Sequence, residues 1–370
     1  MTNKLTRRAL LASTPGVLGG AATFGASPSA WAAESYEAAK ARIWRAGPLQ
    51  GLSGAALSQE LVRYATLAPS SHNTQCWKFA LGGQSVTILP DLSRRCPVVD
   101  PDDHHLYVSL GCAAENLVQA GLALGLASEV HFDATRDAVV VNLSPTPAVV
   151  TSWFKAIPER QCTRGEYDGE ALSAQDLGLL ERAGSNDRVR LLLLTEKTAM
   201  DRVLDFVVQG NTAQLNDRAF VKELKSWIRF SASDAVAQGD GLFGKSSGNP
   251  TLPSWLGNLL FDFVVTAKSE NEKYTRQLHS SAGVAVFVAA KEDKAHWVDV
   301  GRAYERFALQ GTVMGVRNAH VNMPVELAAL RPPFANAIGL GHQRPDLVIR
   351  FGRGPTLPPS LRRPVQAVLV

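Results

Sequence analysis

The chain has 370 residues, of which 45% are apolar, so it is long enough for one large or two ordinary domains with their own cores. Its formal net charge is +4, but Lys4, Arg7 and Arg8 lie in the first 33 residues, which hold no acid, and without these three cations the charge is +1. A balance so close to neutral does not favour nucleic acid as a partner. The four cysteines show no C-x-x-C pair and no zinc-ligand spacing. Four cysteines in so long a chain do not make a disulfide scaffold, although one disulfide stays possible in an oxidising compartment.

The N-terminus has the pattern of an export signal. Thr-Arg-Arg-Ala-Leu-Leu at 6–11 precedes a weakly apolar stretch rich in Gly and Ala, and Ala30-Trp31-Ala32 matches an A-x-A cleavage site. This pattern resembles a bacterial twin-arginine signal, which predicts a periplasmic protein; a disordered basic terminus is the alternative. The apolar stretch is short and broken by Pro15 and by glycines, so we expect no stable membrane anchor. We therefore assign 1–32 to the signal.

Helical and extended patterns follow one another from residue 34 onward. A charged helical lead covers 34–44, a second helix ends before Pro69, and 79–89 has the composition of a strand. The residues Asp-Pro-Asp-Asp at 100–103 predict a turn and a helix start, before a strong helix over 109–126. Residues 130–143 then predict a strand pair with its turn at 133–137.

The turn between the second helix and the first strand gathers polar side chains. Residues 68–79 are A-P-S-S-H-N-T-Q-C-W-K-F, so hydroxyls and amides stand close together in front of an indole. Such a turn can present hydrogen-bond donors and acceptors to a flat polar ring with an apolar body. The structural alternative is a helix-to-strand turn whose polar side chains satisfy the local backbone.

This run resembles the A-P-S-x-x-N-x-Q-P-W-x-F signature of the nitroreductase family, and more closely its long single-chain, Acg-like branch. The matching residues are Ala68, Pro69, Ser70, Asn73, Gln75, Trp77 and Phe79, whereas Cys76 stands where the family has proline. The resemblance implies the α+β nitroreductase fold and FMN as the cofactor. It also implies that the flavin is bound by Pro69, Ser70, Ser71, Asn73 and Gln75.

Three further motifs resemble the same family. Arg160-Gln161-Cys162-Thr163-Arg164 resembles R-x-S-x-R, whose arginines hold the FMN phosphate, as a guanidinium fork suits phosphate oxygens. Exposed arginines on a loop are the alternative, and Cys162 replaces the usual hydroxyl. Pro324-Val325-Glu326 resembles the P-x-E turn, which implies a backbone N–H near flavin N5 and no side-chain catalyst. The C-terminal Arg362 and Arg363 resemble a second phosphate-binding motif.

An internal repeat indicates a tandem fold. Residues 109–126 align with 299–316 at an offset of 190 without a gap, pairing Gly111 with Gly301 and Glu115 with Glu305. Ala-Leu-Ser also precedes an early helix in both copies, at 56–58 and at 171–173. We therefore predict two α+β halves, 33–157 and 158–370, whose small-residue helices pack closely. Family members are usually homodimers with FMN at the interface, which implies a monomer built as an intrachain pseudo-dimer.

An insertion at 211–263 has a middle rich in Gly and Ser and aromatic ends. It resembles the lid of the single-chain branch, and a lid can exclude water or substrate; a surface excursion is the alternative. Within it, 244–248 fits the G-x-S-x-G pattern of serine hydrolases, but that motif needs a strand before it and a helix after it. His104 and His105 are expected to cap a turn, and no metal site is predicted.

The resemblance implies an FMN-dependent oxidoreductase of nitroreductase type. Electrons would pass from NAD(P)H or another donor through flavin N5 to a nitroaromatic, a quinone or a similar small acceptor. The alternative is a non-catalytic protein that sequesters FMN beneath its lid. The sequence names neither the donor nor the acceptor.

Overall fold

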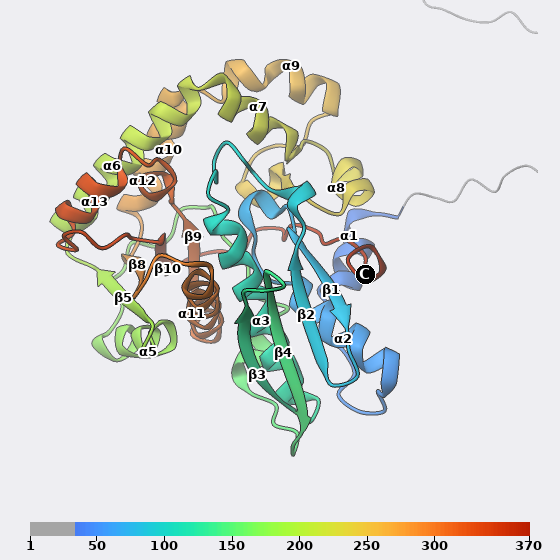
Figure 1. Ribbon diagram of the computed structural model, residues 1–370. Helices are drawn as coiled ribbons and strands as arrows, with labels where there is room; N and C mark the ends of the chain where they lie inside the picture. The colour runs from blue at the N-terminus through green and yellow to red at the C-terminus, as the bar shows by residue number, and fades with distance from the viewer. Residues whose placement is uncertain (1–33) are drawn as a thin grey trace, which may run out of the picture. The chain divides into compact units, whose positions relative to one another are not determined.

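A computed structural model describes residues 34–370, and the export signal predicted at 1–32 lies outside these residues. The first half alternates helices with one four-stranded antiparallel sheet in the order β1-β2-β4-β3 (Figure 1). Its elements are α1 (Tyr36–Ile43), α2 (Gly54–Thr66), β1 (Trp77–Leu81), β2 (Ser85–Pro90), α3 (His104–Ala123), β3 (Leu126–Asp133), β4 (Ala138–Pro145) and α4 (Ser152–Ala156).

The strand predicted over 79–89 is a hairpin of two strands, which corrects that expectation. Trp77 pairs with Pro90 and Leu81 with Val86, so the chain reverses within this run. The reversal falls at Gly82 and Gly83, where the Gly82 amide donates to the Ser85 carbonyl at 2.8 Å. Two adjacent glycines are a turn signal that interrupts an otherwise β-forming run. The predicted pair over 130–143 agrees with β3 and β4, which turn between Asp133 and Ala138.

The second half contains a second four-stranded antiparallel sheet, in the order β5-β8-β10-β9. It also carries several more helices than the first half, none of which, among the residues described, is long and apolar enough to cross a bilayer. Its principal elements are α5 (Ala174–Gly184), β5 (Val189–Leu194), α6 (Lys197–Asn216), α10 (Ala267–His279), β8 (Gly283–Ala289), α11 (Lys294–Val313), β9 (Val316–His320), α12 (Met323–Glu326), α13 (Arg331–Ala337) and β10 (Leu347–Arg353).

The helices α3 and α11 lie side by side between the two sheets (Figure 1). Their closest approach is at Gly111 on α3 and Gly301 on α11, and the Cys112 thiol donates to the Gly301 carbonyl at 3.2 Å. One apolar core continues from the first sheet across both helices to the second sheet. The two long helices predicted from the repeat therefore form the centre of the fold.

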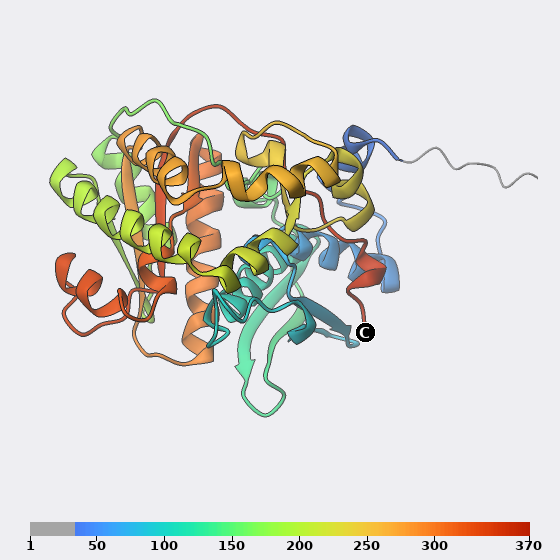
Figure 2. The ribbon, with the colours of Figure 1, turned by 90° about the horizontal axis from the view of Figure 1, so that it is seen from above.

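The region 211–263 is mainly helical, although the sequence pattern emphasised its Gly and Ser residues. Its predicted ends fall inside α6 and α9, and its elements are α7 (Arg218–Ser226), β6 (Ile228–Arg229), α8 (Ala232–Gln238), β7 (Leu242–Phe243) and α9 (Ser254–Val264). The helices α6, α7, α9 and α10 arch over the upper ends of α3 and β9 (Figures 1 and 2). This arch roofs the space in which the predicted motifs meet.

Candidate functional site

The polar turn after α2 is a strained segment held by its own side chains. Three of its residues have left-handed backbones, with φ of 47° at His72, 53° at Asn73 and 54° at Gln75. The Ser70 hydroxyl closes the turn by accepting from the Gln75 amide at 2.9 Å. Non-glycine residues adopt this conformation only where their surroundings hold them there. Such strain is typical of functional turns.

The amide side chains of Asn73 and Gln75 tie this turn to two distant segments. Asn73 Nδ2 donates to the carbonyls of Gly241 at 2.9 Å and Leu361 at 3.1 Å. Gln75 Nε2 donates to the Gly239 carbonyl at 2.9 Å, and its Oε1 accepts from the Arg363 amide at 2.8 Å. These hydrogen bonds reach distant segments, so they differ from the local backbone contacts that the structural alternative assigned to such side chains.

A cavity of about 210 Å³ lies beside this turn, between the two halves and under the arch. The first half contributes Pro69, Ser70, Ser71, His72, His105 and Cys112 to its wall. Residues of the second half and of the 211–263 region also line it, among them Arg164, Gln214, Phe220, Leu224, Leu242, Tyr304, His320, Asn322, Met323 and Glu326. A wall that mixes apolar side chains with a few convergent polar groups is typical of a small-molecule site.

A narrower recess of about 50 Å³ adjoins this cavity, and both are lined by Pro69, Ser70, Arg164 and Leu242. The recess also includes three residues of the predicted phosphate motifs, namely Arg160, Cys162 and Arg362, together with Asn73. Ser246 completes it from the 211–263 region. The site thus has a wide chamber and a cationic end.

The arginines of this recess differ in what they bind. Arg160 is 2% exposed; its Nε lies 3.1 Å from Oε1 of Glu305 and its Nη2 donates to the Leu67 carbonyl at 2.9 Å. Arg362 donates to the carbonyls of Thr66 at 2.7 Å and Leu67 at 3.0 Å. Both guanidiniums thereby fix the C-terminal end of α2 while contributing positive charge to the recess.

Arg164 is the arginine whose guanidinium remains available. Within residues 34–370 its guanidinium makes no hydrogen bond or ion pair, although its carbonyl accepts from Gln277 Nε2. The side chain is half-buried where chamber and recess meet. Arg363, by contrast, does not line the chamber or the recess, because its guanidinium donates to the Ala367 carbonyl at 2.8 Å.

Cys162 carries an activated thiol in the recess. Its Sγ lies 3.6 Å from the Tyr304 hydroxyl and 3.7 Å from Nδ1 of His320. Burial by itself raises the pKa of this thiol, but the His320 imidazole, with Arg160 and Arg164, holds that pKa well below its usual range. The position predicted to have lost a hydroxyl thus holds a group that is readily deprotonated.

The P-x-E turn is the short helix α12, in which Pro324 and Val325 are buried. The amides of Val325 and Glu326 both donate to the Asn322 carbonyl, at 2.8 and 2.9 Å. The turn instead presents the Glu326 carboxyl to the chamber, where Oε2 accepts from Gln214 Nε2 at 2.6 Å. Burial raises the pKa of Glu326, so this carboxyl retains its proton to a higher pH than a solvated one.

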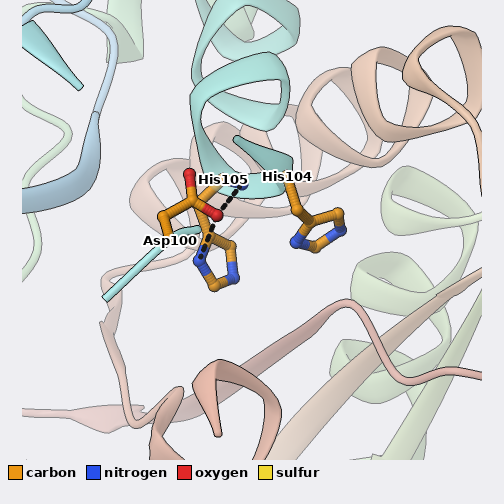
Figure 3. A group of neighbouring side chains, drawn as sticks. All are labelled: Asp100, His104 and His105. Carbon is orange, nitrogen blue, oxygen red and sulfur yellow. Dashed lines mark hydrogen bonds and ion pairs between the residues drawn. The ribbon is translucent and has the colours of Figure 1, made fainter. Parts of the chain in front are cut away.

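Asp100, His104 and His105 cluster at the start of α3 (Figure 3). The Asp100 carboxylate accepts from the amides of His105 and Leu106 at 3.0 and 2.9 Å, and His104 Nε2 lies 2.8 Å from Oδ1 of Asp346. These hydrogen bonds account for the positions of Asp100 and His104. His105 also lines the chamber, so the cluster forms part of its wall.

Two curated proteins are similar in sequence to this chain. Two Mycobacterium tuberculosis proteins, from strains CDC 1551 and H37Rv, are each 27% identical to this chain over 321 residues, covering 82% of it and 88% of each relative. Both are provisionally named NAD(P)H nitroreductases. These relatives support the nitroreductase family for this chain. No protein-family model matches it.

Solved nitroreductases are similar to about half of the chain. A nitroreductase with bound FMN from Desulfitobacterium hafniense shows a TM-score of 0.37 and 15% identity, covering 58% of this chain and 96% of its own. The FMN-dependent nitroreductase of Mycobacterium smegmatis in complex with NADPH shows a TM-score of 0.35 and 13% identity, covering 55% and 87%.

Several residues of this site belong to no motif in the sequence. His320 and Tyr304 reach Cys162 from β9 and α11, and Glu305 reaches Arg160 from more than a hundred residues away. Of these residues, the repeat singles out Glu305, which it aligns with Glu115 inside the long helices. Ser246 lies within 244–248, whose G-x-S-x-G pattern is associated with serine hydrolases and not with flavin binding.

Proposed function

We propose that the protein is an FMN-binding oxidoreductase of the nitroreductase type. The observation that carries this proposal is the two-part site, in which a mixed apolar and polar chamber opens into a cationic recess. A planar ring with a phosphate at the end of a short chain fits such a division. The names of the two curated relatives favour the same chemistry.

The side chains of the site suit this cofactor. Arg164, with no other partner in the part of the chain described, would bind the phosphate, and Arg160 and Arg362 add positive charge behind it. The hydroxyls of Ser70 and Ser71 would face the ring from the strained turn. The flavin, when bound, supplies hydride and electron transfer to and from small molecules. Glu326, whose pKa burial raises, would hold a proton at the chamber wall.

The rival function is storage of FMN without turnover. It is favoured by Phe220, Leu224 and Leu242, which close the chamber with apolar side chains from the 211–263 region. Such a lid excludes water, and it can exclude an acceptor equally well. The donor would be NAD(P)H or another reductant, and the acceptor a nitroaromatic, a quinone or a similar small molecule.

Anaerobic reduction separates the two functions. The purified protein should be yellow and should release FMN on denaturation. An enzyme should be reduced by NADPH or by dithionite, and a nitroaromatic should then restore the oxidised absorbance spectrum within seconds to minutes. Dithionite reduction without reoxidation would favour storage. A colourless protein that takes up no added FMN would refute both functions.

Two further aspects belong to this proposal. We infer that the twin-arginine pattern at 6–11 directs the folded protein to the periplasm. We also infer that one chain acts as the family's dimer, since α3 and α11 pair at the centre and each half has its own four-stranded sheet.

A further inference from the structure

Ser246 has a buried hydroxyl that lacks a hydrogen-bond partner among the described residues. The residue is 5% exposed, and its Oγ makes no hydrogen bond within residues 34–370. It lines the cationic recess together with residues of the R-x-S-x-R motif. Buried hydroxyls are normally hydrogen-bonded, so a fixed one without a partner points to a ligand at this position.

The segment that carries Ser246 is fastened to the strained turn. The carbonyls of Gly239 and Gly241 accept from Gln75 and Asn73, at 2.9 Å each. Both glycines have left-handed backbones, and a Cβ at Gly239 would lie 3.0 Å from the Arg362 carbonyl oxygen. The following 3-10 turn, Gly244–Ser247, is closed by the Asn249 amide on the Gly244 carbonyl at 3.0 Å. These contacts fix the turn that carries the Ser246 hydroxyl.

The recess around Ser246 has the chemistry of an anion site. The guanidinium of Arg164, also without a hydrogen-bond partner among the described residues, lines the recess with it. A hydroxyl donor and a guanidinium can both be satisfied by one oxyanion, whereas neither satisfies the other in this structure. A serine nucleophile would instead need a base within hydrogen-bond reach, and Ser246 Oγ has no partner of any kind in this part of the chain.

We propose that Ser246 donates a hydrogen bond to the terminal phosphate of bound FMN. This inference rests on the proposed function and extends it, because it makes the 211–263 region a part of the phosphate site. Closure of the 211–263 region over the site and binding of the phosphate would then be coupled. The site should therefore discriminate FMN from riboflavin, which has the same ring and no phosphate, through a residue of the lid.

The test compares Ser246→Ala with Ser247→Ala, a matched control in the same turn whose side chain lines neither the chamber nor the recess. Apoprotein is titrated with FMN and with riboflavin, and quenching of flavin fluorescence reports binding. We expect S246A to bind FMN about tenfold more weakly, the loss of one charge-assisted hydrogen bond, and to bind riboflavin as the wild type does. S247A should leave both affinities unchanged, and Ser246→Thr should restore part of the FMN affinity.

The thermal stability of the apoprotein gives a second readout. If Ser246 serves the ligand, removing its unpaired hydroxyl should leave the Tm of the apoprotein unchanged or raise it, because a desolvated polar group is lost. A lower Tm for S246A apoprotein, an equal loss of riboflavin affinity, or an unchanged FMN affinity would each overturn the inference. Failure of the wild type to bind any flavin would instead refute the proposed function.

Discussion

Gly111 of α3 and Gly301 of α11 make reciprocal contacts with the opposite helix. A Cβ on Gly111 would lie 2.0 Å from the Val298 carbonyl oxygen, and a Cβ on Gly301 would lie 1.9 Å from the Val108 carbonyl oxygen. Each glycine thus meets the carbonyl located three residues before its counterpart. The contact has the symmetry of a two-fold axis, and the 190-residue offset between the copies matches it.

Replacing either glycine should destabilise the protein. Gly111→Ala or Gly301→Ala forces the two backbones apart, and we expect a loss of about 3 kcal/mol in the free energy of unfolding, the upper end for overpacking. Gly178→Ala, inside α5, is the control: its nearest neighbour is the flexible end of Arg182 at 3.3 Å, so it should gain up to about 1 kcal/mol from helix propensity. Urea unfolding measures all three. Equal stabilities for G111A and G178A would contradict this packing argument.

The sequence predicted this helix pair well because two independent signals agree. Glycine and alanine at helical spacing mark a close approach, and the repeat marks its partner. The strand over 79–89 was predicted less well, because an apolar run of this length does not show where it turns back. The adjacent Gly82 and Gly83 mark the turn within this run.

The site was predictable only in part, because the sequence does not show which distant segments meet in space. The motifs located Ser70, Arg164 and Glu326, which do meet at the chamber. They could not show that Arg160 is committed to Glu305, or that Asn73 and Gln75 donate to carbonyls near 240. Such pairings depend on which segments meet in space, and a residue type alone does not reveal whether its donors are already used.

Arg164→Ala and Asn73→Ala should weaken flavin binding for different reasons. R164A removes a guanidinium without a hydrogen-bond partner among residues 34–370, so FMN affinity should fall about ten- to a hundredfold while apoprotein stability stays within about 0.5 kcal/mol. N73A removes two hydrogen bonds, so the apoprotein itself should lose ~1–3 kcal/mol. Fluorescence titration and urea unfolding measure the two effects. Arg363→Ala, outside the site, is the control, and a comparable loss of affinity there would argue against this assignment.

Cys162 should be the most reactive thiol of the described chain near neutral pH. A lowered pKa populates the thiolate at lower pH, so its alkylation by iodoacetamide should begin below the usual range for a thiol. Burial raises the pKa of Cys76 to about 12 and also raises that of Cys112, so both should stay unmodified. Mass spectrometry of peptides after brief labelling at several pH values measures this order. Bound FMN should slow the alkylation of Cys162. An alkylation rate that does not change when FMN is added would indicate that the phosphate binds elsewhere.

Export should depend on the paired arginines. Replacing Arg7 and Arg8 with lysine keeps the charge but removes the twin-arginine pattern, so the protein should accumulate in the cytoplasm. Lys4→Arg is the matched control, since it alters a cation outside the pair and should leave export intact. Immunoblots of periplasmic and cytoplasmic fractions measure the distribution. Normal periplasmic levels of the double variant would remove the basis for the export proposal.

Each chain should bind one FMN, although its two halves suggest two related sites. The proposed site combines the polar turn of the first half with Arg164 of the second half. At the reciprocal position, the second half has the turn 183–187, with no Pro-Ser-Ser and no Gln-x-Trp. The Ser185 hydroxyl there accepts from the Leu191 amide at 3.3 Å, and Asn186 Oδ1 accepts from the Val189 amide at 2.9 Å.

Among residues 34–157, the arginine at the reciprocal position is already paired. Arg45, which aligns with the R-x-S-x-R motif, is paired with Glu60 at 2.9 Å, and that carboxylate also binds Arg63. A Cβ on Gly184 would lie 2.6 Å from the Leu191 side chain, so the start of this turn packs against the core. The reciprocal position therefore has its turn hydroxyl and amide satisfied and its arginine paired, although a cavity of about 440 Å³ lies beside Arg45 and Glu60.

Titration of apoprotein with FMN under stoichiometric conditions tests this asymmetry. We expect fluorescence quenching to end sharply at one equivalent per chain, and R164A to remove that single transition. Arg45→Ala is the matched control: it breaks an ion pair at the reciprocal position, and should leave both the stoichiometry and the affinity unchanged. Two equivalents bound with similar affinity, or a loss of half the sites in the Arg45 variant, would show that the second half still holds a working flavin site.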